Sequence, residues 1–294
     1  MKPFKHVTKV IFISLLVLIG TYPARTQQQK PEIQVRKVAD NLYCISNAGG
    51  NIGVLVADQK LLLIDAGLPM LADDVAVKLY EFSPFPVKML VNTHYHRDHT
   101  GGNPVLGKDA DIISHRKCRD SMLANLKPEE SAEGLGLPNL TFENRLEIQW
   151  GTEPVKLIYV GPDHTAGDVV VVFPKKRVIH TGDLFFNGVP PYIDVAAGAD
   201  TENWVQTIQA LVERYPDYQV VPGHGPVTDM AHFRAFATYL EALRTQVAAA
   251  IEAGKTREET QESVTLDEFA HLKEFGSLTR KNNVGWVYDE LTKK

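Results

Sequence analysis

Residues 94–99 read His-Tyr-His-Arg-Asp-His, and this hexapeptide constrains the fold of the chain more than any other feature. Imidazole and carboxylate are side chains that zinc and similar divalent cations prefer. On an extended backbone, residues two apart point the same way, so we expect His94 and His96 to converge on one metal ion. A turn after them, continued by two glycines, would direct Asp98 and His99 to a second position nearby. The fold must therefore bring further ligands to this segment.

Three later segments follow the same pattern: an apolar run is joined to a tight turn, and the turn carries a residue of a type that binds metals. His164 lies in a turn between two apolar runs, Asp183 ends a third run, and His224 stands between two glycines. Catalytic residues commonly lie on such loops, which a rigid scaffold holds in place. A single residue of this kind is more often a cap or a surface turn. Together with the first cluster, however, the three predict one shared site.

The order of these motifs resembles that of the metallo-β-lactamase superfamily of hydrolases over about residues 33–228. Asp65, in the run Leu-Leu-Ile-Asp-Ala-Gly at 62–67, matches the first motif of that superfamily. The resemblance implies an α/β (α+β) fold class, in the form of a four-layer αββα sandwich. It also implies that the metals lie at one edge, between the two sheets.

The same resemblance implies a role for each matching residue. The implied ligands of the first zinc ion are His94, His96 and His164. The implied ligands of the second zinc ion are Asp98, His99 and His224. Asp183 would bridge the two Zn2+ ions, and Asp65 would orient ligands by hydrogen bonding. We interpret Asp168 and His180 as structural, and three further histidines outside the motifs as structural or solvated: His115, His232 and His271.

The chemistry follows from this ligand set, which leaves coordination positions open for water. A zinc ion lowers the pKa of bound water to near neutrality, and two zinc ions can also polarise a substrate carbonyl. We therefore expect a dinuclear zinc-dependent hydrolase in which metal-bound hydroxide attacks an acyl centre of a small-molecule substrate. Asp98 is the predicted catalytic residue, because a free carboxylate oxygen could relay the proton to the leaving group.

The substrate stays open between several classes. One lactamase subclass of the superfamily has a cysteine at the position of Asp183 and a lysine at that of Phe186, and both departures count against that subclass. His99 resembles a subclass whose second zinc is held by Asp-His-His, and also the glyoxalase II-like thioesterases. β-Lactam hydrolysis, thioesterase activity and lactonase activity are thus the alternatives. Outside hydrolysis, the alternative is an iron-dependent oxidoreductase similar to persulfide dioxygenases, although the seven ligand positions favour two metals.

Aromatic residues follow Asp183 and have two possible interpretations. Phe186 and Tyr192 could line a mostly apolar substrate cleft. Alternatively, they pack a loop against the core. The sequence does not decide between the two interpretations.

The N-terminus has the layout of a secretory signal peptide over residues 1–24. Three lysines precede the apolar run 10–20, which is too short to span a bilayer comfortably. Residues 25–32 are predicted to be a polar linker, and residues 33–294 the hydrolase domain, with a helical tail from about residue 230. We therefore expect a periplasmic or secreted protein without a stable membrane anchor.

Charge and cysteine content narrow the remaining possibilities. The formal net charge of −5 and the lack of a basic run after the leader argue against nucleic acid as a partner. Cys44 and Cys118 are favoured as free, buried thiols. A disulfide between them stays open, since export would permit one.

Hydrophobic periodicity predicts the main elements of the domain. Helices are expected at 71–82, 115–126, 201–215 and 231–253. Strands are expected at 87–91, 155–160, 168–174 and 177–182. Thr201 is the predicted N-cap of the third helix.

Overall fold

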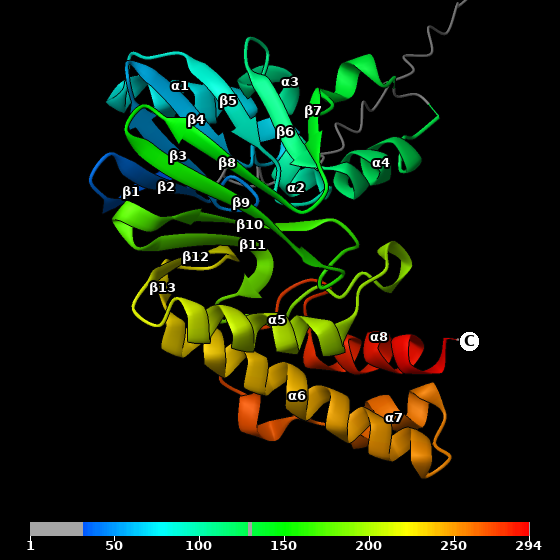
Figure 1. Cartoon of the computed structure of the whole chain (residues 1–294). Coiled ribbons are helices and arrows are strands. Elements are labelled where there is room, and N and C mark those ends of the chain that lie inside the picture. The colour runs from blue at the N-terminus through cyan, green and yellow to red at the C-terminus, as the bar shows by residue number, and fades with distance from the viewer. Residues whose placement is uncertain (1–31, 129–130, 294) are drawn as a thin grey trace, which may run out of the picture. The chain divides into compact units, whose positions relative to one another are not determined.

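Two β-sheets stacked face to face form the centre of the fold (Figure 1). The computed structural model describes residues 32–128 and 131–293. Within them the first sheet has the strand order β1-β2-β3-β4-β5-β6-β7. Its strands are β1 (Gln34–Ala39), β2 (Leu42–Ser46), β3 (Ile52–Ala57), β4 (Lys60–Ile64), β5 (Val87–Val91), β6 (Asp111–His115) and β7 (Leu140–Phe142).

The second sheet has the order β13-β12-β11-β10-β9-β8. Its strands are β8 (Arg145–Trp150), β9 (Glu153–Gly161), β10 (Asp168–Phe173), β11 (Val178–Phe186), β12 (Gln219–His224) and β13 (Thr228–Asp229). In each sheet an antiparallel run of strands changes to parallel pairing, at β4–β5 in the first sheet and at β11–β12 in the second. Parallel neighbours need a crossover connection, and helices supply these crossovers.

Helices cover the outer face of each sheet (Figure 1). Those of the first sheet are α1 (Ala72–Phe82), α2 (Arg97–Thr100), α3 (Asn103–Leu106) and α4 (Arg116–Ala124). Those on the side of the second sheet are α5 (Thr201–Arg214), α6 (Met230–Glu252) and α8 (Arg280–Thr292), and α7 (Arg257–Ser263) packs against α6 and α8. Short 3-10 turns are η1 (Pro69–Leu71), η2 (Glu133–Leu135), η3 (Pro174–Lys176), η4 (Val195–Ala197) and η5 (Asp267–Phe269).

Alternation along the strands explains how four layers pack. In β10, Val169 and Val171 belong to the apolar cluster between the sheets, whereas Val170 and Val172 belong to the cluster under α5 and α6. Strand side chains point alternately to the two faces, so a strand buried on both faces is apolar throughout. The predicted αββα arrangement is therefore confirmed, with one apolar cluster at each of its three interfaces.

The predicted N-cap of α5 is wrong by one residue. Asp200 caps the helix, because its carboxylate accepts from the backbone N–H groups of Glu202 and Asn203 at 3.1 and 2.9 Å. The Thr201 hydroxyl instead donates to Glu290 of α8. A threonine and an aspartate are both good caps, and the contact with α8 was not visible in the local sequence.

Both cysteines are buried free thiols, as predicted. Cys44 lies in the cluster between the sheets, where burial raises its pKa to about 12. Cys118 lies on α4. The predicted leader, 1–24, and all of the predicted linker except residue 32 lie outside the described residues. No helix of the described residues has the length and apolar character needed to cross a membrane.

Candidate metal centre

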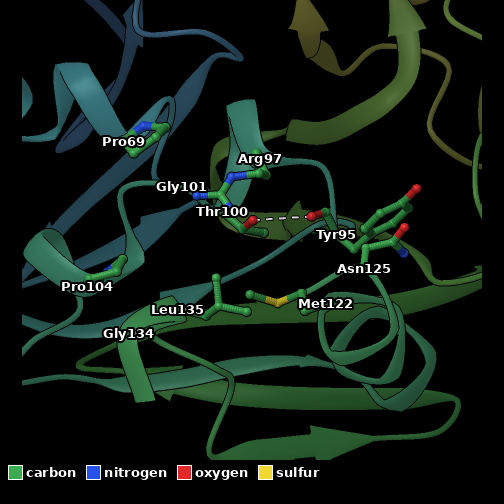
Figure 2. A pocket seen from close by; sticks show the side chains of 10 residues that line it. All are labelled: Pro69, Tyr95, Arg97, Thr100, Gly101, Pro104, Met122, Asn125, Gly134 and Leu135. Atoms are coloured by element: carbon green, nitrogen blue, oxygen red, sulfur yellow. Dashed lines mark hydrogen bonds between the residues drawn. The ribbon is translucent and has the colours of Figure 1, made fainter. Parts of the chain in front are cut away.

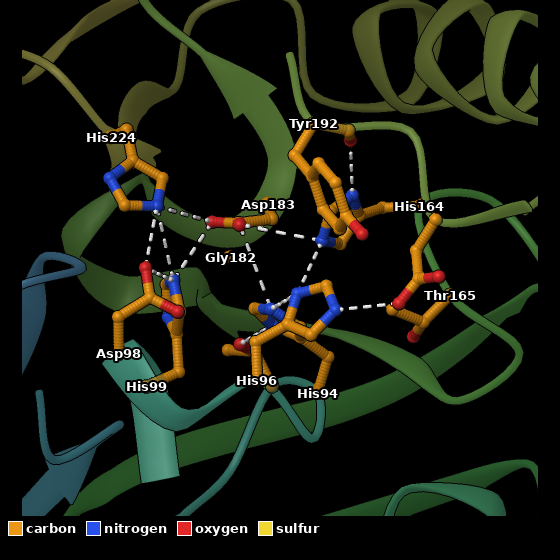
Figure 3. A network of polar contacts seen from close by, with 12 residues as sticks. His94, His96, Asp98, His99, His164, Thr165, Gly182, Asp183, Tyr192 and His224 are labelled. Carbon is orange, nitrogen blue, oxygen red and sulfur yellow. Dashed lines mark hydrogen bonds and ion pairs between the residues drawn. The ribbon is translucent and has the colours of Figure 1, made fainter. Parts of the chain in front are cut away.

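The seven residues predicted as ligands meet at one edge of the two sheets (Figure 3). Six of them come from the end of a strand or from the segment that follows it, whereas Asp183 lies within β11, which continues past the expected strand end to Phe186. His94 and His96 follow β5, and Asp98 and His99 lie in α2 directly after them. The other three come from the second sheet: His164 from the β9–β10 turn, Asp183 from β11 and His224 from the last position of β12.

The first ligand group consists of His94, His96, His164 and Asp183, whose ligand atoms lie within 4.8 Å of one another. His96 Nδ1 lies 3.1 Å from His94 Nε2 and 3.0 Å from His164 Nε2. Asp183 Oδ2 lies 3.6 Å from His94 Nε2 and 3.4 Å from His164 Nε2. Three imidazole nitrogens thus face one point, with a carboxylate oxygen beside them.

The second ligand group consists of Asp98, His99 and His224. His224 Nε2 lies 3.2 Å from Asp98 Oδ2 and 3.4 Å from His99 Nε2. The second oxygen of Asp183 faces this group, at 3.0 Å from His99 Nε2 and 3.4 Å from His224 Nε2. Asp183 therefore lies between the two groups and presents one oxygen to each.

This arrangement fits divalent metal ions. Four ligands at the usual Zn–N distance of about 2.0–2.1 Å stand roughly 3.3 Å apart in a tetrahedron, close to the nitrogen separations of the first group. Asp183 Oδ1 is buried and has no hydrogen-bond partner despite its short distance to His99. Neutral imidazoles cannot all donate to one another, so their convergence suits a shared cation.

The electrostatics differ between the groups. Burial holds the pKa of His94 well below its usual range and lowers that of His164 to about 3, so both are in the neutral form that binds metals. Burial also opposes a charge on His224, but Asp183 and Asp98 raise its pKa to about 9. Burial would raise the pKa of Asp183, yet His99, His224 and His94 hold it well below the usual range.

Asp65 forms hydrogen bonds with the segment that carries the first candidate ligands. It is fully buried, and its carboxylate accepts from the Thr93 backbone N–H and hydroxyl, both at 2.8 Å. His99 Nδ1 lies 2.9 Å from Asp65 Oδ2, which leaves Nε2 to face the second group. Such hydrogen bonds fix the tautomer and the ring orientation of a metal-binding histidine.

Sequence reasoning missed a second orienting element, which we call the orienting loop (residues 187–200). Asp194 Oδ2 lies 2.9 Å from His96 Nε2 and accepts from the Tyr95 hydroxyl at 2.6 Å. Two residues earlier, the backbone carbonyl of Tyr192 lies 2.8 Å from His164 Nδ1. The one feature of the sequence that could have indicated this loop was Asp194 itself, an acid 11 positions after Asp183. No local pattern relates the two residues.

The residues interpreted as structural have no ligand atom in either group. Asp168 closes the turn that carries His164, since it accepts from the Thr165 N–H at 2.7 Å and hydroxyl at 2.6 Å. His180 is buried in β11, and its Nδ1 accepts from the Gly182 N–H. His115 is also buried and stacks on Tyr159 at 3.8 Å between ring centroids.

The two aromatic candidates for a substrate cleft have different environments. Phe186 is buried with the core under α6 and stacks on His224, at 5.0 Å between centroids. This burial agrees with the packing alternative for Phe186. Tyr192 is exposed and lies 5.6 Å from the His96 ring. Tyr192 is thus an exposed residue beside the first group, whereas Phe186 is a buried residue packed on His224 of the second group.

Two glycines are needed because the backbone passes close to ligands. A β-carbon at Gly50 would collide with the His99 ring, and one at Gly223 would collide with Asp183 Oδ1. Neither contact could be relieved without moving a ligand. These positions explain why Gly-rich turns flank the ligand residues in the sequence.

A cavity of about 150 Å³ lies beside the metal-binding segment (Figure 2). Tyr95 and Arg97, which alternate with the ligands, line one side, and Met122 and Leu135 line the opposite side. Tyr95 links this cavity to the first group, because its hydroxyl donates to Asp194, the same carboxylate that contacts His96.

Comparisons with known proteins agree with this geometry. The chain is 26% identical over 208 residues to the metallo-beta-lactamase type 2 of Elizabethkingia meningoseptica, an alignment that covers 67% of this chain and 80% of that protein. It is 28% identical over 192 residues to the 2,4-dinitroanisole O-demethylase subunit alpha of Nocardioides sp. (strain JS1661), covering 65% of this chain but only 53% of that protein.

Solved structures resemble the fold at lower identity. A metallo-beta-lactamase from Pontibacter korlensis matches with a TM-score of 0.61 and 23% identity, over 71% of this chain and 99% of that one. A stereoselective inverting sec-alkylsulfatase from Pseudomonas sp. matches with a TM-score of 0.70 and 17% identity, and the match covers 88% of this chain and 50% of that one. The profile of the metallo-beta-lactamase superfamily matches residues 47–224, more than half of the chain. The chain therefore belongs to the metallo-beta-lactamase superfamily.

Proposed function

We propose that the protein is an exported, dinuclear zinc-dependent hydrolase that acts on an acyl substrate. One observation carries this proposal: two groups of ligand atoms share Asp183, which presents one oxygen to each. The first zinc ion would be held by His94, His96 and His164, and the second by Asp98, His99 and His224. Asp183 would bind both.

Two zinc ions, when bound, supply an acidified water molecule and a Lewis acid for the substrate carbonyl. The chain's own residues prepare the site for them. Asp65 and Asp194 hold the rings of His99 and His96 so that one nitrogen of each faces inward. The negative charge of Asp183 offsets the repulsion between two cations at short distance.

Asp98 is the proposed catalytic residue. Burial would raise its pKa, but His99 and His224 hold it at about 2, so the carboxylate is ionised at neutral pH. Its Oδ2 atom faces His224, and a third of its side chain stays exposed. We assign to Oδ1 the acceptance of a proton from the attacking water and its transfer to the leaving group. Water thus adds across the acyl bond, giving an acid and a free amine, alcohol or thiol.

The superfamily supports a hydrolase and leaves the substrate class open. A relative named as a lactamase and another named as an O-demethylase have similar identity to this chain. The presence of Asp183 and of the buried Phe186, in place of a cysteine and a lysine, is evidence against one lactamase subclass. We therefore propose an acyl substrate, with β-lactams tested first and lactones and thioesters next.

Export is part of the proposal and rests on the sequence of residues 1–24. Their basic start and apolar middle are typical of a signal peptide. A periplasmic or secreted enzyme would meet β-lactams arriving from outside the cell. Fractionation of the native host, followed by N-terminal sequencing of the mature protein, tests this step. A mature chain that starts at residue 1 in the cytosolic fraction would refute it.

The first experiment combines metal analysis with turnover. Purified protein is loaded with Zn2+, its metal content is measured, and hydrolysis of a chromogenic cephalosporin, a lactone and a thioester is followed. The test variant is Asp98→Ala, and the control is Asp217→Ala, an exposed acid whose side chain pairs with Arg177.

We expect two zinc ions per chain and turnover of at least one substrate that is lost in Asp98→Ala alone. Equal turnover in all three proteins would refute the assignment of Asp98. A protein purified with iron, which consumes oxygen with a persulfide substrate and hydrolyses none of the three, would favour the dioxygenase-like alternative.

A further inference from the structure

We propose that Asn283 of α8 is a positioning residue for the first metal. It holds the orienting loop (187–200), through which the rings of His96 and His164 are aimed. This inference rests on the proposed function, because it assumes that these histidines bind a metal. It extends the proposal to a part of the chain beyond residues 47–224, which the superfamily profile matches.

The orienting loop controls two of the three histidines of the first group. The Tyr192 carbonyl lies 2.8 Å from His164 Nδ1, and Asp194 Oδ2 lies 2.9 Å from His96 Nε2. In both rings the loop contacts the nitrogen that faces away from the other ligands. A displacement of this loop would therefore turn both rings together.

The loop is attached to the C-terminal segment at several points. The Asn283 side chain donates to the Pro191 carbonyl at 2.7 Å, and Pro191 directly precedes Tyr192. The Lys273 backbone N–H donates to the Gly188 carbonyl at 2.9 Å. The Lys293 ammonium donates to the Val195 carbonyl, also at 2.9 Å, from an exposed position. Asn283 has no exposed surface, so its hydrogen bond is shielded from competing water.

The orientation of the Asn283 amide is fixed from its other side. The hydroxyl of Tyr239, on α6, donates to Asn283 Oδ1 at 2.6 Å. Because Oδ1 is an acceptor there, the amide nitrogen must face Pro191. Tyr239 is buried as well, so α6, α8 and the loop are joined by two buried hydrogen bonds in series.

A second contact reaches the loop from the same face of α8. Trp286 is three residues after Asn283, and residues at this spacing are neighbours on a helix surface. Its ring packs edge-on against Tyr192, at 5.0 Å between centroids. α8 thus touches both Pro191 and Tyr192, the two residues whose carbonyls connect Asn283 to His164.

Loss of the hydrogen bond between Asn283 and Pro191 is expected to lower the affinity for the first metal. Partners that hydrogen-bond a metal-binding histidine typically contribute 10- to 100-fold to metal affinity. Asn283 acts one step further away, so we expect about a 10-fold loss when its contact with Pro191 is removed. The second group is oriented by Asp65, which the loop does not contact in the described residues, and should keep its affinity.

The test compares two variants that both lack the Tyr239 hydroxyl. Tyr239→Phe is the control, since it keeps the bond from Asn283 to Pro191. The combined variant Tyr239→Phe with Asn283→Leu replaces the polar pair by an apolar one and removes that bond. Cobalt and zinc dissociation constants are measured for the full chain by chelator competition, together with the visible absorption spectrum of the cobalt form and the thermal unfolding midpoint of each metal-free protein.

We expect the combined variant to bind the first metal about 10-fold more weakly than Tyr239→Phe, and its cobalt spectrum to shift. Turnover should fall with little change in KM. Equal affinity and identical spectra in the two variants would overturn the inference. The inference would also be overturned if both variants lost metal affinity in proportion to a loss of thermal stability.

A further variant covers the case in which the combined variant does not fold. Trp286→Leu leaves both hydrogen bonds intact but removes the ring that packs on Tyr192. A weaker first metal with a shifted cobalt spectrum would support the inference, and wild-type values would overturn it. A wild-type protein that binds no metal at all would instead refute the proposed function, and this inference with it.

Discussion

The two ligand groups of the candidate centre differ in charge, exposure and support. The first consists of three histidines that are at most 15% exposed, of which His94 and His164 have lowered pKa values because they are buried. The second contains Asp98 and His224, which are 33% and 23% exposed, together with the buried His99, and the carboxylates of Asp183 and Asp98 raise the pKa of His224. If the proposed function holds, we expect the buried first group to bind its metal more tightly, and the more exposed second group to be the side that water and substrate reach.

Their supports also come from different parts of the chain. Asp65 orients the second group from the end of β4 in the first sheet. Asp194 and the Tyr192 carbonyl orient the first group from the orienting loop, which α8 holds. We therefore expect that metal binding at the two groups can be weakened separately, which the following variants test.

The largest effect is expected for Asp183→Asn, since this side chain serves both groups. Loss of its negative charge should lower the content of bound zinc to below one per chain. Turnover should fall by about 1,000-fold or more, which corresponds to about 4 kcal/mol of activation free energy. Metal analysis and steady-state kinetics check both effects. Two retained zinc ions would show that the groups do not share Asp183.

Asp98→Ala should separate the groups most clearly. It removes a ligand and the proposed proton acceptor of the second group, so turnover should fall about 100- to 10,000-fold. The first group is left intact, and one zinc ion per chain should remain tightly bound. Loss of both metals would contradict the independence of the first group. The measurements are metal titration and turnover of the substrate identified for the wild-type protein.

Asp194→Ala should have the converse effect. The His96 ring loses the carboxylate that fixes its orientation, and affinity for the first metal should fall by about 10- to 100-fold. Affinity for the second metal should stay close to the wild-type value. Stepwise zinc titration against a chelator distinguishes the two sites. A uniform loss at both sites would refute the separate support of the two groups.

Asp65→Asn should weaken mainly the second metal, by about 10-fold. A smaller effect on the first metal is expected as well, because Asp65 also bonds Thr93, whose hydroxyl lies 3.0 Å from His94 Nδ1. The same titration serves as the measurement. An effect on the first metal alone would reverse the assignment of supports.

The smallest effect is expected for Phe186→Leu. The ring packs in the core and stacks behind His224, so its truncation should cost about 1–2 kcal/mol of unfolding free energy. Affinity for either metal should change by less than about threefold. Denaturant unfolding and metal titration check these values. A large change in substrate preference without loss of stability would instead favour the cleft interpretation.

Much of the fold was predictable because its signals are local. The valine run of β10 is apolar at every position, which indicates a strand buried on both faces. The helices α1 and α6 were predicted to within one residue at each end from their periodicity. Strand β8 was not predicted, although Arg145–Trp150 alternates polar and apolar residues, the pattern of a strand with one exposed face.

The candidate ligand residues were also recognisable in the sequence. His94, His96, Asp98 and His99 are adjacent along the chain, and Gly-rich turns mark His164, Asp183 and His224. Asp194 and Asn283 had no such mark. Their partners, His96 and Pro191, are 98 and 92 residues away in the sequence, so no local pattern could link them.

The sequence by itself determined which residue types could bind metal and which strands would present them, because a ligand motif and an apolar strand each depend on neighbours along the chain. Only the tertiary structure decided that Asp183 presents one oxygen to each group, and that the second group is oriented from the first sheet and the first from the orienting loop. These properties depend on distances of about 3 Å between side chains from different layers. Such distances exist only once the sheets and helices have packed.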